Sequence, residues 1–158
     1  MEVRTPSGIE EVYREHAAKL WRSLVAFTGS REIASDAVAE AFAQVIARGE
    51  GVREPGRWVW RVAYRVAAGL LQAHTRPADF PSALDHSENV ERDADLMAAL
   101  AKLPQRQRAA VVLHYLVDLP TREVATTLGV TPTTVRVLLM QGRRHLHDLL
   151  GGPDERPS

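Results

Sequence analysis

The residues with the clearest capacity for chemistry are aromatic and arginine side chains that alternate within one short stretch. Trp58, Trp60 and Tyr64 are interleaved there with Arg61 and Arg65. Aromatic rings stack on unpaired bases while guanidinium groups hold phosphates, so the pattern suits single-stranded nucleic acid. The alternative is that Trp58 and one further ring close a hydrophobic core.

Catalytic and metal-binding patterns are not convincing in this sequence. Asp36 and Glu40 share one face of a predicted helix, but helical carboxylates without a pocket imply no acid–base chemistry. His145 and His147 are two residues apart, so they do not face each other as helical metal ligands would. The chain contains no cysteine, which excludes a thiolate metal site and a cysteine nucleophile. We therefore expect a non-enzymatic protein without a cofactor or metal.

The composition is typical of a soluble globular protein, with 45% hydrophobic and 25% charged residues. No apolar run approaches the roughly 18–20 residues that span a bilayer, and the acidic start of the chain does not resemble a signal peptide. We expect a cytoplasmic protein with no membrane partner. Its net charge of zero is low for an independent DNA-binding protein, because phosphate neutralisation supplies much of such affinity.

Hydrophobic spacing predicts an all-α fold of two small helical domains joined by an acidic flexible linker. Three helices are expected in residues 8–73, where Gly29 ends the first and Ser30 caps the second. The linker, residues 74–95, contains two prolines and has a net charge of −4. Residues 96–150 resume the helical pattern, and residues 151–158 are expected to form a disordered tail.

The second domain ends in a pattern typical of a helix-turn-helix. Ala125, Gly129 and Val135 have the spacing of a small contact residue, a turn glycine and an apolar anchor. Thr131 followed by Pro132 marks the start of the last helix. The inner stripe of that helix is predicted to consist of Val135, Leu139, Gly142, Leu146 and Leu149. A plain helical hairpin is the alternative.

The outward side of the last helix carries side chains that suit DNA. Arginine binds a phosphate or a guanine edge, and threonine can do either. The predicted DNA contacts there are Thr133, Thr134, Arg136, Arg143 and Arg144. Val137 and Met140 also face outward, where they suit either thymine methyl groups or a protein surface. A solvated helix face is the alternative for each arginine.

Two segments together resemble the extracytoplasmic-function (ECF) sigma factors of bacterial RNA polymerase. The segment "LPQRQRAAVVLHYLVDLPTREVATTLGVTPTTVRVLLMQGRRHLHDLL" is similar to the family's −35-reading domain. The segment "VYREHAAKLWRSLVAFTGSREIASDAVAEAFAQVIAR", followed by "PGRWVWRVAYRVAAGLL", is similar to its N-terminal domain. The resemblance covers roughly residues 8–73 and 96–150, in the family's order.

This resemblance implies a transcription initiation subunit that acts with core RNA polymerase on promoter DNA. Residues 8–73 would hold the polymerase clamp and open the −10 element, and residues 96–150 would read the −35 element. Asp36, Glu40 and Phe42 match the "D-x-V-x-E-x-F" run of the clamp-binding helix. The acidic linker would lie in a basic polymerase channel or act as a plain spacer. An anti-sigma factor or a companion sigma-like subunit is a further expected partner.

The DNA-facing positions depart from the family pattern. Arg65 stands where members often have asparagine, and Val137, Leu138 and Met140 replace polar or basic residues. Two interpretations follow. The chain is a working sigma factor whose weak DNA-reading domains act together once polymerase carries both. Alternatively, it is a sigma-like accessory subunit that binds polymerase or another regulator without reading promoters itself.

Overall fold

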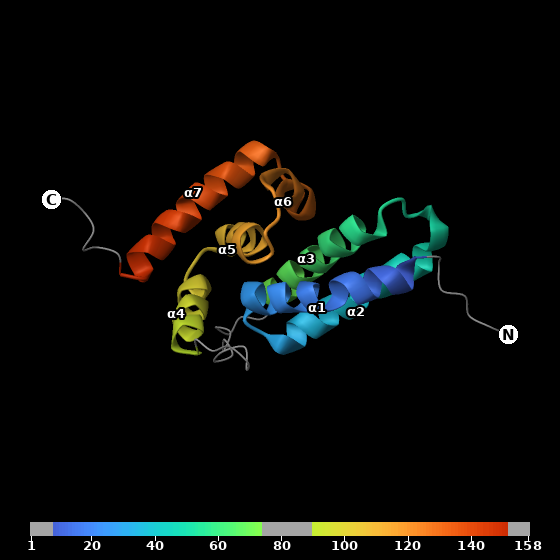
Figure 1. Ribbon diagram of the computed structural model, residues 1–158, viewed down its shortest axis with the longest axis horizontal. Helices are drawn as coiled ribbons and strands as arrows, with labels where there is room; N and C mark the ends of the chain where they lie inside the picture. The colour runs from blue at the N-terminus through green and yellow to red at the C-terminus, as the bar shows by residue number, and fades with distance from the viewer. Residues whose placement is uncertain (1–7, 74–89, 152–158) are drawn as a thin grey trace.

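The computed structural model describes residues 8–73 and 90–151, and every regular element in these two ranges is helical (Figure 1). The N-terminal half contains α1 (Ile9–Thr28), α2 (Arg31–Arg48) and α3 (Pro55–Ala73), with a short 3-10 turn, η1 (Gly49–Gly51), after α2. The C-terminal half contains α4 (Val90–Ala101), α5 (Gln105–Val111), α6 (Thr121–Leu128) and α7 (Pro132–Leu149). A π-helical turn, η2 (Val112–Leu116), extends α5.

Local sequence signals fix the corner between α1 and α2. Gly29 ends α1 with a φ of 73°, a left-handed conformation that glycine adopts without steric cost, and its amide donates to the Val25 carbonyl. The Ser30 hydroxyl accepts a hydrogen bond from the Ile33 amide at 3.0 Å, which caps α2 as predicted. The two helices therefore turn back on each other and pack side by side with α3.

The core of the N-terminal half consists of apolar residues that recur at helical spacing on the facing sides of α1, α2 and α3. Small residues on α2 and α3 allow the helix backbones to approach closely. Fully buried members of this core are Leu20, Leu24, Ala37, Val45, Val59 and Ala63.

The helix-turn-helix pattern is present in α6 and α7. Gly129 has a φ of 70° in the turn, and the Val130 amide donates to the Ala125 carbonyl at 3.0 Å. The Thr131 hydroxyl accepts from the Thr134 amide at 3.1 Å, and Pro132 opens α7 as expected. Val135, Leu139 and Gly142 are buried, as the predicted inner stripe requires.

Two details of the predicted C-terminal half are wrong. Leu149 is 40% exposed, because the last turn of α7 lies beside α4 and beyond the core that holds the start of the helix (Figure 1). Helical structure begins at Val90, so α4 includes the last part of the segment expected to be linker. Residues 74–89 of that expected linker, and the predicted tail from residue 152, lie outside the described residues.

The two halves are in contact, with α6 lying against α3 (Figure 1). Arg108 of α5 donates from Nε to the Phe27 carbonyl of α1 at 2.7 Å. Arg57 of α3 forms an ion pair with Glu123 of α6 at 2.7 Å. Buried residues of both halves belong to one continuous hydrophobic cluster. The expected pair of helical bodies therefore shares an extensive interface.

Two general features of the described ranges bear on function. Among residues 8–73 and 90–151, no helix has both the length and the hydropathy needed to cross a membrane. Within the same ranges, no group of three or more His, Asp or Glu side chains has an arrangement that could hold a metal ion.

Candidate nucleic-acid interface

The aromatic side chains of α3 are more buried than a base-stacking surface requires. Tyr64 is 2% exposed, and its ring stacks on Phe27 at 5.1 Å between centroids. Trp60 is also buried, and its Nε1 donates to His16 Nδ1 at 3.1 Å. Trp58 is half-buried beneath the Arg48 guanidinium, 5.4 Å from the ring centroid. In this arrangement these rings mainly pack inside the protein.

The Tyr64 hydroxyl is buried without a hydrogen-bond partner. The neighbouring Ser23 hydroxyl donates to the Leu20 carbonyl at 2.8 Å. Burial raises the pKa of Tyr64 above its ordinary value. The polar hydroxyl of Ser23 nearby lowers this pKa by less than burial raises it. Tyr64 is therefore a neutral, unused donor at the contact between the two halves.

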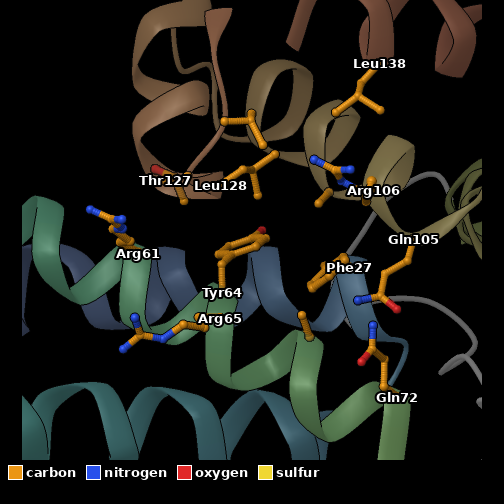
Figure 2. Close-up of a pocket in the computed structure, with 14 residues that line it drawn as sticks. Phe27, Arg61, Tyr64, Arg65, Gln72, Gln105, Arg106, Thr127, Leu128 and Leu138 are labelled. Atoms are coloured by element: carbon orange, nitrogen blue, oxygen red, sulfur yellow. The ribbon is translucent and has the colours of Figure 1, made fainter. Parts of the chain in front are cut away.

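Arg61 and Arg65 are the exposed members of the α3 pattern. Both line a cavity between α3 and the helix-turn-helix, together with Tyr64 (Figure 2). Neither guanidinium has a hydrogen-bond or ion-pair partner among the described residues. The predicted DNA-binding residues of α3 thus lie at the junction of the two halves.

The start of α7 presents a separate polar surface. Thr133 and Arg136 are exposed, and Nη2 of Arg136 donates a hydrogen bond to the Thr133 hydroxyl at 3.4 Å. Thr134 is half-buried, and its hydroxyl accepts from that of Thr131 at 3.0 Å. Val137 and Met140 are 42% and 47% exposed on the same helix. This surface therefore combines one exposed arginine with a mainly apolar patch.

The other two arginines of α7 differ in their surroundings. Arg143 Nη1 donates to the Tyr115 hydroxyl at 2.7 Å, so this side chain is tied to the end of η2. Arg144 is exposed. None of the predicted DNA contacts on α7 lines the cavity between the halves, so α3 and α7 present two distinct candidate surfaces.

The predicted polymerase-binding residues divide into an outer and an inner group. Asp36 and Glu40 are exposed one turn apart on α2, and Glu40 accepts from Gln44 Nε2 at 2.8 Å. Phe42 is buried, with its ring in edge-to-face contact with Tyr13 at 5.0 Å. The structure therefore exposes Asp36 and Glu40 on the outer side of α2 and buries Phe42.

Sequence patterns did not reveal the cavity between the halves, which has a volume of about 340 Å³. It combines residues from α1, α3, α5, α6 and α7, which are far apart in the sequence (Figure 2). Arg106, Gln72 and Gln105 belong to its lining but to no recognisable motif. Local spacing contains no signal for such a site, because the site exists only once the halves pack together.

The geometry of α6 and α7 is that of a helix-turn-helix, and residues 93–146 match the family model described as "Sigma-70, region 4". The ECF RNA polymerase sigma factor SigE of Mycolicibacterium smegmatis is 32% identical over 157 residues, which cover 89% of this chain and 61% of SigE. The RNA polymerase sigma factor SigV of Bacillus subtilis is 27% identical, covering 79% of this chain and 80% of SigV. The chain is therefore similar to ECF sigma factors over most of its length.

Two solved structures share the fold of both halves. CnrH in complex with the cytosolic domain of CnrY superposes with a TM-score of 0.70 at 18% identity, covering 90% of this chain and 86% of CnrH. The sigma factor RpoE of Bartonella quintana, in complex with the anti-sigma factor NepR, gives a TM-score of 0.67 at 16% identity over 89% of this chain and 95% of RpoE. The chain is shorter than some of its relatives. It spans 61% of the length of SigE and 54% of the length of the probable ECF sigma factor SigI of Mycobacterium tuberculosis.

Proposed function

We propose that this protein is a promoter-recognising sigma subunit that acts in the cytoplasm with core RNA polymerase. The observation that carries the proposal is the relationship to SigE, which extends across both helical halves and includes the region 4 match. Catalysis would belong to the polymerase, and the chain would contribute binding surfaces without a cofactor. Residues 8–73 would bind the clamp and the −10 element, and residues 96–150 would bind the −35 element. Residues 74–95 would link these two parts.

The surfaces described above support specific roles within this proposal. The exposed carboxylates of Asp36 and Glu40 suit charge-assisted contacts with arginines of the clamp. Arg136 is exposed near the start of α7, and it would contact the major groove if α7 acts as a recognition helix. Arg61 and Arg65 of α3 suit the phosphates of an opened −10 strand.

The contact between the halves has a consequence for this role. Tyr64 is buried at the contact between the halves, so promoter DNA would reach its ring only after α6 separates from α3, whereas Arg61 and Arg65 are exposed at the edge of the cavity. Polymerase binding would supply the free energy for that separation and hold both DNA-reading surfaces at a high effective concentration. The net charge of zero is compatible with this division of labour.

The proposal is tested by in vitro transcription with core polymerase, this protein and fragmented genomic DNA, followed by sequencing of transcript 5′ ends. We expect start sites that share upstream elements at −10 and −35 and that vanish when the protein is omitted. Polymerase binding without any specific start site would contradict the proposal. It would favour an accessory subunit, for which the exposed Val137 and Met140 are the supporting observation.

An anti-sigma factor is a further proposed partner. The support is the fold shared with RpoE, which is solved with the anti-sigma factor NepR. The apolar patch formed by Val137 and Met140 would be one surface for such a partner, since exposed apolar side chains grouped on one helix favour protein contacts.

Charge reversal on α2 tests the polymerase contact. The double change Asp36→Arg and Glu40→Arg is expected to weaken core polymerase binding by at least about tenfold, because it places like charges opposite the clamp arginines. Affinity is measured by fluorescence anisotropy with labelled protein. The matched control is Glu15→Arg on α1, an exposed residue outside the proposed contact. Equal affinities for the double variant and the control would remove this assignment.

Truncation on α7 tests the promoter contact. Arg136→Ala is expected to lower promoter occupancy by roughly tenfold, because an arginine contact with a base pair contributes about 1–3 kcal/mol. Occupancy is measured by footprinting of the polymerase holoenzyme. His147→Ala, near the other end of α7, serves as the control. Unchanged occupancy in Arg136→Ala would show that this helix face does not read the promoter.

A further inference from the structure

The cavity at the junction of the halves has the size and shape of a small-ligand site. Its volume of about 340 Å³ falls in the range of roughly 300–1,000 Å³ that such sites occupy. Phe27 and Tyr64 line it from the N-terminal half, and Leu128 and Leu138 line it from the helix-turn-helix (Figure 2). A ligand there would have apolar side chains on two opposite sides.

The charges around this cavity are all positive. Arg61 and Arg65 of α3 and Arg106 of α5 line it, and no aspartate or glutamate among the described residues does. None of these three guanidinium groups has a hydrogen-bond or ion-pair partner within the two described ranges. Unpaired arginines around an apolar site favour a ligand that carries a phosphate, because guanidinium groups bind phosphate oxygens through two parallel hydrogen bonds.

Polar side chains at the cavity suit the remainder of such a ligand. Gln72 of α3 and Gln105 of α5 point toward one another at one end of it (Figure 2). Each amide offers both donors and an acceptor, which matches the mixed edge of a nucleobase. The Tyr64 hydroxyl, which has no partner, points toward α6 at the middle of the lining. A polar ligand atom entering between α3 and α6 would provide the acceptor that this buried donor lacks.

From these features we propose that the cavity between α3 and the helix-turn-helix binds a free nucleotide. The phosphates would lie against Arg61 and Arg106, and the base would lie between the apolar side chains, near the two glutamine amides. Arg65 lies at the edge of the cavity, with its guanidinium group directed away from it (Figure 2). Neither half forms the site alone, because the lining residues come from both. The bound nucleotide therefore stabilises the contact between α3 and α6.

A regulatory consequence follows if the proposed sigma function holds. A nucleotide would occupy Arg61, which is also a proposed contact for the −10 strand. It would also oppose the separation of the halves that promoter binding requires. The nucleotide would therefore act as an inhibitor of initiation, although its binding to the free protein does not depend on that function.

Binding is tested by isothermal titration calorimetry of the full chain with GDP and with ADP. We expect saturable binding of one nucleotide per chain and a higher Tm in its presence. Arg106→Gln is expected to weaken binding by at least tenfold, because it removes a charge at the phosphates without altering a buried residue. Arg122→Gln on α6, an exposed arginine outside the cavity, is the matched control and should bind normally.

A second variant tests the cavity itself without removing an arginine charge. Leu138→Trp keeps all three arginines but fills the cavity, and it should also abolish binding. Circular dichroism and the Tm of each variant without nucleotide establish that it is folded. Should Leu138→Trp fail to fold, the binding measurement on Arg106→Gln alone tests the proposal. Absence of saturable binding at millimolar nucleotide would overturn the proposal, as would normal binding by Arg106→Gln.

Two further ligands define which chemistry is recognised. Pyrophosphate binding as tight as that of GDP would show an anion site without base recognition and would overturn the assignment. Binding of a single-stranded decanucleotide but of neither nucleotide would also overturn it, and would assign the cavity to promoter DNA. These measurements need no polymerase, so their failure is distinguishable from failure of the proposed function.

The proposed stabilisation of the contact between the two halves can be measured directly as a distance between them. The chain has no cysteine, so Ala43→Cys on α2 and His147→Cys on α7 provide two unique labelling positions, both at exposed residues. Double electron–electron resonance between spin labels there should give a narrower distance distribution with GDP than without it. An unchanged or broader distribution at saturating nucleotide would contradict the stabilisation of the closed arrangement.

Discussion

Replacing Arg108 with alanine is expected to lower the free energy of unfolding by about 3 kcal/mol or more, because it leaves several buried carbonyl oxygens without a donor. Arg108 is 8% exposed. Its Nε donates to the Phe27 carbonyl at 2.7 Å and its Nη1 to the Leu103 carbonyl at 3.0 Å. Burial lowers its pKa from the ordinary value, and no acidic side chain among the described residues pairs with it.

Chemical denaturation monitored by circular dichroism measures this effect. Arg106→Ala is the control, because Arg106 lies two residues away on the same helix, is exposed and has no hydrogen-bond partner among the described residues. Its replacement should change stability by less than about 0.5 kcal/mol. Arg108→Lys is expected to be destabilised as well, since a single ammonium group cannot reach carbonyls at several positions as the planar guanidinium does. Equal stability of Arg108→Ala and Arg106→Ala would contradict this account.

Introducing a methyl group at Gly142 is expected to destabilise the protein by about 1–3 kcal/mol through overpacking. A Cβ atom built at this position would lie 2.6 Å from Cγ2 of Val111, where α7 crosses α5. Val111 is buried, and its branched side chain has few alternative rotamers, so it cannot move aside cheaply. Helix propensity alone would predict the opposite sign, because alanine is favoured over glycine by about 1 kcal/mol within a helix.

Two variants make this prediction decisive. Gly69→Ala in α3 is the control, because Gly69 is exposed and a Cβ atom added there would meet no neighbouring atom of the described residues within 4 Å. That change should stabilise the protein by about 0.5–1 kcal/mol. Combining Gly142→Ala with Val111→Ala should recover stability relative to the sum of the two single changes, since the second removes the clashing methyl group. Strict additivity of the two changes would exclude the steric explanation.

Local elements of the fold could be predicted because their signals are contained in a few neighbouring residues. The hydroxyl groups of Ser30 and Thr131 each cap a helix by accepting a hydrogen bond from the backbone amide three residues later. Gly29 and Gly129 end helices with positive φ, which few other residues adopt readily. The inner stripe of α7 was predictable down to Gly142, because its first part packs on elements that are close in sequence.

The arrangement of the two halves could not be predicted in the same way. Periodicity identifies the apolar side of a helix but does not identify the distant element that covers it. The α3 pattern therefore fitted both a base-stacking surface and a core, and in this structure Trp60 and Tyr64 are buried in the core. Arg108 has a sequence context that suggests a solvated side chain, and only the tertiary contact reveals its buried position.

Arg108 holds the junction by bonding to the main chain of its neighbours, and this has a consequence for how such proteins diverge. A carbonyl oxygen is present whatever residue occupies its position, so substitutions at residues 27, 100, 101 and 103 leave all of its acceptors in place. Pairwise covariation across homologues would therefore miss these hydrogen bonds, and the side-chain link across the junction that it could detect is the Arg108 guanidinium over the Phe27 ring, 5.8 Å from the centroid. Selection for these hydrogen bonds would instead act on residue 108 itself, where we expect little besides arginine to be tolerated.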